Sequence, residues 1–201
     1  MTAHAGGHLI SFEGLDQSGK QTQAERLLQG LRASGRATHF LTFPAYQTAI
    51  GAEIGRALQG ERDYAPDVMQ LLYVANRYEH RPAIERWLGE GDIVVCDRYL
   101  ASSIAYGEAQ GVDGAWLDAV QQHLPHPSLT LLLDIPPAAS LARKQRDRDR
   151  YERDLQLLDR VRASYLKQAS QPHWVRVDGT QDKDAVTRDV SDAVRSRLGL
   201  L

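Results

Sequence analysis

The sequence predicts a three-layer α/β fold in which helices flank a parallel sheet of five strands. Five short apolar segments alternate with segments whose apolar residues recur at helical spacing. The apolar segments are nearly continuous, which is typical of strands buried on both faces of a parallel sheet. The chain has no internal repeat and no long Pro/Gly/Ser linker, so residues 1–201 are expected to form one domain.

The two patterns place the elements along the chain. The predicted strands are HLISFE (8–13), THFLTF (38–43), DIVVCD (92–97), LTLLLDI (129–135) and HWVRVD (173–178). One predicted helix follows the first strand, with a face formed by Ala24, Leu27, Leu28 and Leu31. Three more are predicted over residues 66–88, 155–169 and 183–198.

Composition and charge argue against several classes of function. Acids and bases nearly balance at a formal net charge of −2, which disfavours a broad nucleic-acid-binding surface. No apolar run approaches the roughly 20 residues that span a membrane. Residues 1–7 lack the pattern of a secretory signal and are expected to be disordered. Cys96 is the one cysteine, so a reducing, cytoplasmic setting without disulfides is expected, and Cys96 is interpreted as a core residue.

A phosphate loop is predicted between the first strand and the helix that follows it. The segment FEGLDQSGKQTQ (12–23) fits the pattern G-x-x-x-x-G-K from Gly14 to Lys20. The two glycines allow the backbone to curl with its N–H groups inward, and Lys20 adds a positive charge. Phosphates are therefore expected against the loop and the helix N-terminus. The predicted contacts are Gly14, Leu15, Asp16, Gln17, Ser18, Gly19, Lys20, Gln21 and Thr22.

Gln21 departs from the usual phosphate loop, which has Ser or Thr at this position to hold a metal ion. Either the amide oxygen of Gln21 approaches Mg²⁺, or the ion is held through waters. Mg²⁺ needs only one or two carboxylates besides phosphate oxygens, and Asp16 and Asp97 are the candidates. The alternative for Asp16 is that its side chain points to solvent.

Polar residues also follow the second and third predicted strands, in TFPAY (42–46) and DRYLASSIAY (97–106). Ligands gather at the carboxyl ends of the strands in parallel sheets. Phe43, Asp97 and Arg98 are therefore expected to share one crevice with the phosphate loop. Arg98 can clamp a phosphate with two hydrogen bonds, although an Asp-Arg pair alone is more often a surface ion pair.

With LLYVANRYEH (71–80) and RKQRDRDRYERD (143–154), these motifs resemble the thymidylate kinase family of P-loop nucleoside monophosphate kinases. The resemblance runs from about His8 to the final helix. It implies the strand order 2-3-1-4-5 and an arginine-rich lid over about residues 143–154. It also implies Mg²⁺-dependent phosphoryl transfer from ATP to dTMP, giving dTDP and ADP for dTTP synthesis. A homodimer is implied too, and the helix over residues 66–88 has enough apolar residues to serve two faces.

The resemblance assigns roles in an acceptor site. Phe43 and Pro44 would pack against the nucleotide, Tyr73 would stack on thymine, and Arg77 would donate to a carbonyl of the base. On the residues alone, Tyr73 fits a helix core equally well. The sugar and phosphate contacts are assigned to Asp16 for the 3'-hydroxyl, Arg98 for the phosphate, and Ser103 and Tyr106 for the sugar and base. The bulk of Tyr106 would exclude a 2'-hydroxyl.

RKQRDRDRYERD by itself would be interpreted as a solvated helix face. In a kinase, a closing arginine stabilises the charge on the transferred group. Gln17 stands where some family members carry an arginine, so the lid is expected to supply the cation. The predicted catalytic residues are Lys20, Arg98, Asp16 and the lid candidates Arg146, Arg148 and Arg150. The resemblance further places Arg143, Gly179 and Thr180 at the adenine, and Tyr151 and Glu152 at the acceptor.

Two alternatives remain open on the sequence. The first is another small P-loop kinase, acting on a deoxynucleoside or on a different monophosphate. A nucleoside kinase needs a base near the 5'-hydroxyl, and Glu13 or Asp97 would be that carboxylate. The second is a non-catalytic P-loop module that binds nucleotide as a switch, against which the base-pocket residues Tyr73 and Arg77 argue.

Overall fold

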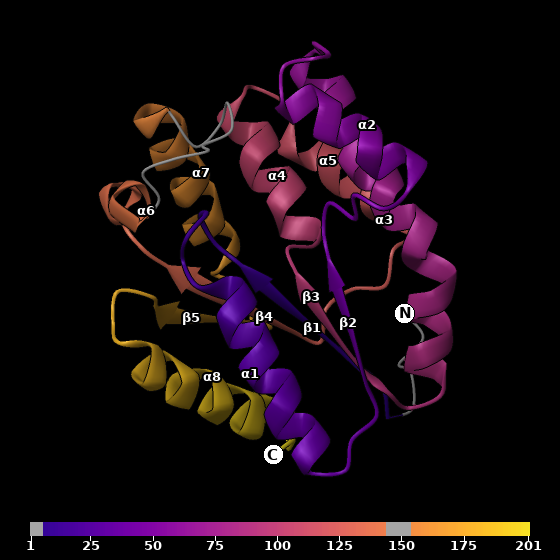
Figure 1. Ribbon diagram of the computed structural model, residues 1–201, viewed down its shortest axis with the longest axis vertical. Coiled ribbons are helices and arrows are strands. Elements are labelled where there is room, and N and C mark those ends of the chain that lie inside the picture. The colour runs from indigo at the N-terminus through magenta and orange to yellow at the C-terminus, as the bar shows by residue number, and fades with distance from the viewer. Residues whose placement is uncertain (1–5, 144–153) are drawn as a thin grey trace.

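The computed structural model describes residues 6–143 and 154–201 (Figure 1). A five-stranded parallel sheet has the order β2-β3-β1-β4-β5, which confirms the predicted fold and strand order. The strands are β1 (His8–Glu13), β2 (Thr38–Thr42), β3 (Ile93–Asp97), β4 (Leu129–Asp134) and β5 (Trp174–Asp178). The expectations for residues 1–5 and for 144–153 lie outside the described residues.

Helices cover both faces of the sheet and give the three layers. They are α1 (Lys20–Ala33), α2 (Ala49–Leu58), α3 (Pro66–Gly89), α4 (Leu100–Ala109), α5 (Gly114–Gln121), α6 (Pro137–Arg143), α7 (Leu155–Gln168) and α8 (Lys183–Leu198). In Figure 1, α1 and α8 lie side by side on one face, and α3, α4 and α7 cover the other. The phosphate loop leaves the carboxyl end of β1, where β3 also ends.

Burial on both faces accounts for the continuous apolar strands. On one face, Phe12 packs with Leu31 of α1 and Val194 of α8. On the other face, Cys96 lies with Ile84 of α3 in a separate cluster. Cys96 is fully buried, and that burial raises the pKa of its thiol, so the interpretation as a core residue is correct.

The apolar residues of α3 divide between two faces of the helix. Met69, Val74 and Ile84 are buried, whereas Val68 and Leu71 are 40% and 42% exposed. The helical spacing of Val68 and Leu71 therefore marks the outer face of α3 and not the core. No helix within residues 6–143 and 154–201 is long and apolar enough to cross a membrane.

Candidate active site

The phosphate loop links β1 to α1 through residues 14–19. Gly14 has φ +137°, and a Cβ there would lie 2.4 Å from the carbonyl oxygen of Leu133, so a side chain is sterically excluded. Gly19 is the N-cap residue of α1 with φ +96°, and the helix has neither a side-chain cap nor an acidic residue in its first turn. The first N–H groups of α1 and the positive end of its dipole are therefore suited to an anion.

Lys20 lies inside the curl of this loop. Its side chain is buried, and Nζ donates to the carbonyl oxygens of Gly14 (3.1 Å) and Leu15 (2.8 Å). Burial and the nearby Arg98 guanidinium lower the pKa of Lys20 to about 8, against the opposing effect of Asp97 and other carboxylates. The lysine is thus a desolvated cation at the place where phosphate is expected.

Gln21 is turned away from the inside of the loop. Its side chain is exposed, and its amide nitrogen donates to Glu25 Oε1 at 3.0 Å, one turn further along α1. Thr22 is exposed as well. The amide of Gln21 therefore already has a partner on the outer face of α1.

Arg98 and Asp16 meet at the carboxyl ends of β3 and β1. Arg98 Nη2 lies 2.6 Å from Asp16 Oδ1, and the Tyr106 hydroxyl donates to Asp16 Oδ2 at 3.0 Å. The alternative that Asp16 points to solvent is therefore wrong. Burial alone would raise the pKa of Asp16, but Arg98 and Lys20 together hold it well below its usual range. Asp16 is ionised and bound to Arg98, whose backbone is left-handed at φ +63°.

A buried carboxylate behind Arg98 fixes the loop after β3. Glu13 is fully buried, and its oxygens accept hydrogen bonds from the Tyr99 backbone N–H (2.8 Å), the Ser102 hydroxyl (2.7 Å) and the Tyr165 hydroxyl (3.2 Å). Burial raises the pKa of Glu13, although these hydrogen bonds oppose the rise. Arg98 Nη1 in turn donates to Ser102 and to Tyr165, both at 3.3 Å. Hydroxyl groups from α4 and α7 thus connect Glu13 to Arg98.

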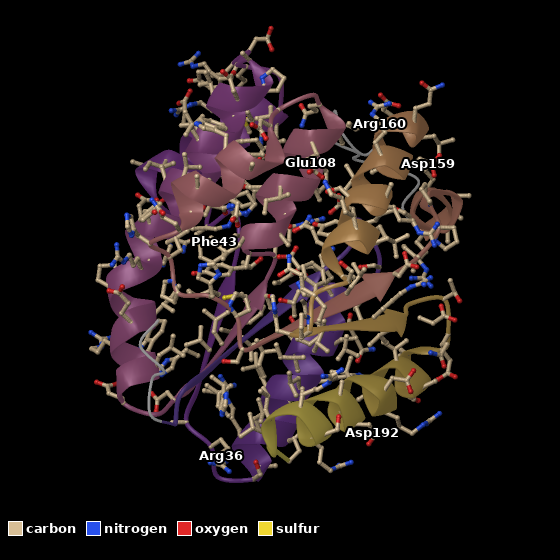
Figure 2. The ribbon with its side chains drawn as sticks, turned by 180° about the vertical axis from the view of Figure 1, so that it is seen from behind. Arg36, Phe43, Glu108, Asp159, Arg160 and Asp192 are labelled. Carbon is tan, nitrogen blue, oxygen red and sulfur yellow. The ribbon has the colours of Figure 1, made fainter. Side chains whose placement is uncertain are left out.

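Hydrogen bonds also connect helix α7 to α4. Figure 2 labels Glu108 on α4 and Arg160 on α7, where the two helices lie side by side. Arg160 Nε donates to the carbonyl oxygen of Ala109 at 2.9 Å, and Ser164 donates to Glu108. Tyr165 is therefore held against the site by contacts along the whole interface.

One pocket joins Arg98 to helix α3. Asp16, Phe43, Pro44, Tyr73, Arg77, Arg98, Ser103 and Tyr106 line it, which are all of the described residues predicted for the acceptor site. It also takes in Tyr46, Leu58, Gln70 and Ser102, which the sequence reasoning missed. The pocket side of α3 was recognisable from the spacing of Tyr73 and Arg77, and Gln70 stands on that same side.

Arg77 lines the pocket from α3. Its side chain is buried, with Nη1 donating to Ser103 Oγ at 2.7 Å and to Gln121 Oε1 at 3.3 Å. Its guanidinium lies 5.9 Å from the centroid of the Phe43 ring, which is labelled in the interior in Figure 2. Tyr73 is half-buried, lines the pocket and also packs against the cluster around Ile54. The packing agrees with the helix-core interpretation of Tyr73, and its stacking on a base stays a prediction.

Asp97 has the character of a cation ligand. Its Oδ1 is buried and has no hydrogen-bond partner among residues 6–143 and 154–201, and the same is true of the Ser18 hydroxyl. Buried polar atoms are normally paired, so an unpaired carboxylate oxygen at a strand end fits a missing cation. No group of three or more His, Cys, Asp and Glu residues suited to a metal occurs in the described part of the chain. A hydrated ion shared with phosphate oxygens is compatible with this donor set.

Arg143 connects the phosphate loop to the loop after β5. It donates to the carbonyl oxygens of Gln17 and Gly179, both at 3.0 Å. Thr180 forms a tight turn on Asp178 through its backbone N–H and its hydroxyl. Of the three residues predicted at the adenine, Arg143 and Gly179 thus lie beside the phosphate loop, and Thr180 directly follows Gly179. The predicted lid residues Arg146, Arg148, Arg150, Tyr151 and Glu152 fall outside the described residues.

The fold and the site together define a class of protein. A parallel sheet of this order, with a phosphate loop after its first strand and a separate pocket with a buried arginine, is the architecture of a P-loop kinase acting on a small acceptor.

Comparisons with known proteins specify the family. The family model described as thymidylate kinase matches residues 12–190. The chain is 32% identical to thymidylate kinase from Homo sapiens over 196 residues, covering 94% of this chain and 92% of that protein. It is 32% identical to the Plasmodium falciparum enzyme over 185 residues, covering 92% and 88%. The solved structure of thymidylate kinase from Candida albicans superimposes with a TM-score of 0.84 at 30% identity, covering 94% and 92%. The chain belongs to the thymidylate kinase family.

Proposed function

We propose that this chain transfers a phosphoryl group from ATP to dTMP, giving dTDP and ADP for the synthesis of dTTP. One observation carries the proposal. A single pocket combines the Asp16–Arg98 pair next to the phosphate loop with the aromatic and arginine side chains Tyr73 and Arg77 of α3. A switch protein has no use for such a base pocket, whereas a nucleotide kinase requires one.

Catalysis follows from position and charge. Lys20 and the N-terminus of α1 hold the donor phosphates, and Arg98 directs its guanidinium at the acceptor phosphate. Asp16 orients Arg98 and accepts a hydrogen bond from the 3'-hydroxyl of the acceptor sugar. The phosphate of dTMP is already ionised near neutral pH, so the attacking oxygen needs no general base.

Recognition of the nucleoside rests on the other end of the pocket. Tyr73 stacks on the base, Phe43 and Pro44 pack against the nucleotide, and Arg77 donates to a base carbonyl. Ser103 holds Arg77 in place and lines the sugar and base together with Tyr106. The Tyr106 ring beside the sugar favours the deoxy form.

Asp97 is the residue best suited to hold Mg²⁺, because its buried Oδ1 lacks a protein partner in the described structure. Asp16 is the second predicted ligand, although Arg98 and Tyr106 occupy both of its oxygens in the protein alone. When bound, the ion would offset charge on the phosphate oxygens. The outward turn of Gln21 favours coordination through waters over coordination by its amide.

The remaining assignments complete the proposal. Arg143, Gly179 and Thr180 border the adenine, and one arginine among Arg146, Arg148 and Arg150 stabilises the transferred group from the lid. Tyr151 and Glu152 are proposed to contact the acceptor.

Two copies are proposed to pair along α3, where Val68 and Leu71 are exposed. A reducing, cytoplasmic setting suits the single buried cysteine.

The structure disfavours Glu13 as the base of a deoxynucleoside kinase. Glu13, one of the two carboxylates considered as its base, is fully buried, and both of its oxygens accept hydrogen bonds from the protein. It is not among the residues that line the acceptor pocket. Glu13 therefore cannot remove a proton from a bound hydroxyl.

An ADP-release assay with ATP, Mg²⁺ and the acceptors dTMP, dUMP, dCMP, UMP and thymidine tests the proposal. Strong turnover with dTMP, weaker turnover with dUMP and little with UMP or thymidine is expected. Turnover with thymidine but not dTMP would support a nucleoside kinase. ATP binding without turnover on any acceptor would support a non-catalytic module.

A further inference from the structure

Gln70 of α3 is a buried amide without a hydrogen-bond partner in the described part of the chain. Its side chain is 1% exposed, and neither Nε2 nor Oε1 has a hydrogen-bond partner among residues 6–143 and 154–201. Nearly all buried side-chain amides are hydrogen-bonded, so an amide whose nitrogen and oxygen both lack a partner is unusual. Gln70 also lines the acceptor pocket, which gives these atoms a place to find a ligand.

The position of Gln70 along α3 relates it to the proposed base site. Gln70, Tyr73 and Arg77 occupy positions i, i+3 and i+7 and therefore share one face of the helix. Gln70 stands one turn before the ring proposed to stack on the base, and Arg77 stands one turn after it. A base on Tyr73 is thus flanked by one amide and one guanidinium from the same helix.

Gly107 of α4 allows the aliphatic part of the Gln70 side chain to pack closely against the helix. A Cβ at Gly107 would lie 3.4 Å from Gln70 Cγ and 2.2 Å from Leu117 Cδ1 of α5. The missing side chain lets α3 and α5 approach α4, and the stem of Gln70 packs in the space that results. The amide beyond Cγ is therefore confined before any ligand binds, which reduces the entropy cost of a hydrogen bond to it.

The chemistry of an amide matches the polar edge of a pyrimidine. The Gln side chain offers one acceptor and one donor side by side, as it does when it pairs with a base edge in nucleic acid. Thymine presents an N3–H donor beside carbonyl acceptors. Arg77 has only donors and serves a carbonyl alone, so it cannot accept from N3–H.

We propose that Gln70 is a specificity-determining residue whose amide pairs with N3–H and an adjacent carbonyl of the acceptor's pyrimidine. This inference rests on the proposed function, because it concerns the base of the same acceptor. In this arrangement Gln70 accepts a hydrogen bond from N3–H, Tyr73 stacks on the base and Arg77 donates to a carbonyl of the base.

The test pairs one change in the protein with one change in the ligand. Gln70→Leu keeps the approximate volume and removes the amide, and N3-methyl-dTMP removes the donor from the base. The kcat/KM for dTMP is expected to fall about 10- to 100-fold in Gln70→Leu, mainly through KM. The preference of the wild type for dTMP over N3-methyl-dTMP is expected to shrink by about tenfold or more in this variant.

Gln168→Leu is the matched control. Gln168 is a buried glutamine on α7 outside the acceptor pocket, and its amide donates to the carbonyl oxygen of Ala101 at 3.3 Å. This variant is expected to lose thermal stability and keep the wild-type ratio of the two ligands. Gln70→Leu is expected to show an unchanged or higher melting temperature, because it removes an unpaired buried amide. A residue with a merely structural role would behave like Gln168.

Calorimetric binding of both ligands is measured beside turnover. Wild-type protein that binds dTMP without phosphorylating it would contradict the proposed function, and the binding ratios would still decide the role of Gln70. Equal ligand ratios in wild type and Gln70→Leu, or an unchanged affinity for dTMP, would overturn the inference. Absence of dTMP binding by the wild type would overturn both.

Discussion

The two ends of the acceptor pocket are built differently. At the phosphoryl end, the guanidinium of Arg98 is held by the Asp16 carboxylate and by the hydroxyl groups of Ser102 and Tyr165. At the base end, Gln70 has no partner in the described structure, and Nε of Arg77 is also unpaired there.

The difference shows how one pocket separates catalysis from recognition. A charged group is costly to bury alone, so the arginine that meets the phosphate is positioned by the protein itself. Burying a neutral amide without a partner costs less free energy than burying an unpaired charge. Only a ligand whose base edge can hydrogen-bond to the amide offsets that cost. Variants of the phosphoryl end should therefore slow every acceptor alike, whereas variants of the base end should discriminate among acceptors.

The largest effect is expected for Lys20→Ala. The variant should fold but lose turnover by about 100-fold or more on every acceptor, because it removes the buried cation of the phosphate loop. Initial rates with dTMP and dUMP, together with circular dichroism, check this. Lys167→Ala, which removes a lysine 75% exposed on α7, is the control and should match the wild type. Wild-type turnover in Lys20→Ala would contradict the site.

The next effect is expected for Asp97→Asn. The Mg²⁺ concentration for half-maximal rate should rise by about 10- to 100-fold, because the amide replaces a charged oxygen with a neutral one. Asp92→Asn is the control, since Asp92 precedes the opposite end of β3 and pairs with His39 at 2.7 Å. Equal Mg²⁺ dependence of the two variants would exclude Asp97 as the ligand.

A smaller effect is expected for Tyr165→Phe. Loss of the hydroxyl removes one hydrogen bond to Arg98 and one to Glu13, so kcat should fall by about tenfold. The ratio of dTMP to dUMP turnover should stay that of the wild type, since both acceptors carry the same phosphate. Tyr78→Phe, whose hydroxyl donates to the carbonyl oxygen of Val120, is the control. A loss of turnover in Tyr165→Phe that differs between dTMP and dUMP would contradict the separation of catalysis and base recognition between the two ends of the pocket.

The smallest effect concerns pH and the affinity for ATP. The pKa of Lys20 in the free protein is lowered to about 8, first by burial and then by Arg98. Phosphate favours the protonated lysine, so as pH rises through about 8 the free protein loses the proton that binding requires. The Kd for ATP should therefore rise by at most about tenfold per pH unit above that pKa. Calorimetry between about pH 7 and pH 9 measures this, and a constant Kd would show that Lys20 stays protonated.

Much of the fold and part of the site were predictable because the signals are local. The strands follow from short apolar runs, and the phosphate loop follows from the spacing between Gly14 and Lys20. The ends of parallel strands share one edge of a sheet, so Asp97, Arg98 and Phe43 were expected together. The strand order came from the resemblance to a family, since periodicity carries no information on the order of parallel strands.

Other features depended on contacts between distant parts of the chain. Tyr165 reaches Glu13 from 152 positions away, and no motif marks it. Glu13 looked available as a base because it precedes the phosphate loop, but α4 and α7 bury it. The outer face of α3, with Val68 and Leu71, could not be told from its inner face by helical spacing alone.

The linear sequence specified the five strands, the helices α1, α3, α7 and α8, the phosphate loop and the acidic and basic residues at the strand ends, whereas α2, α4, α5 and α6 were not predicted. Short-range spacing encodes these features, and the backbone geometry of strands, turns and helix starts depends on nearby residues. Which polar atoms are paired depended on how the elements pack in three dimensions. Packing links Glu13 to Arg98 through hydroxyl groups of two other helices. It also leaves the Gln70 amide at the base end without a hydrogen-bond partner in the described part of the chain. Hydrogen-bond satisfaction depends on three-dimensional packing between elements, and the linear pattern does not contain that information.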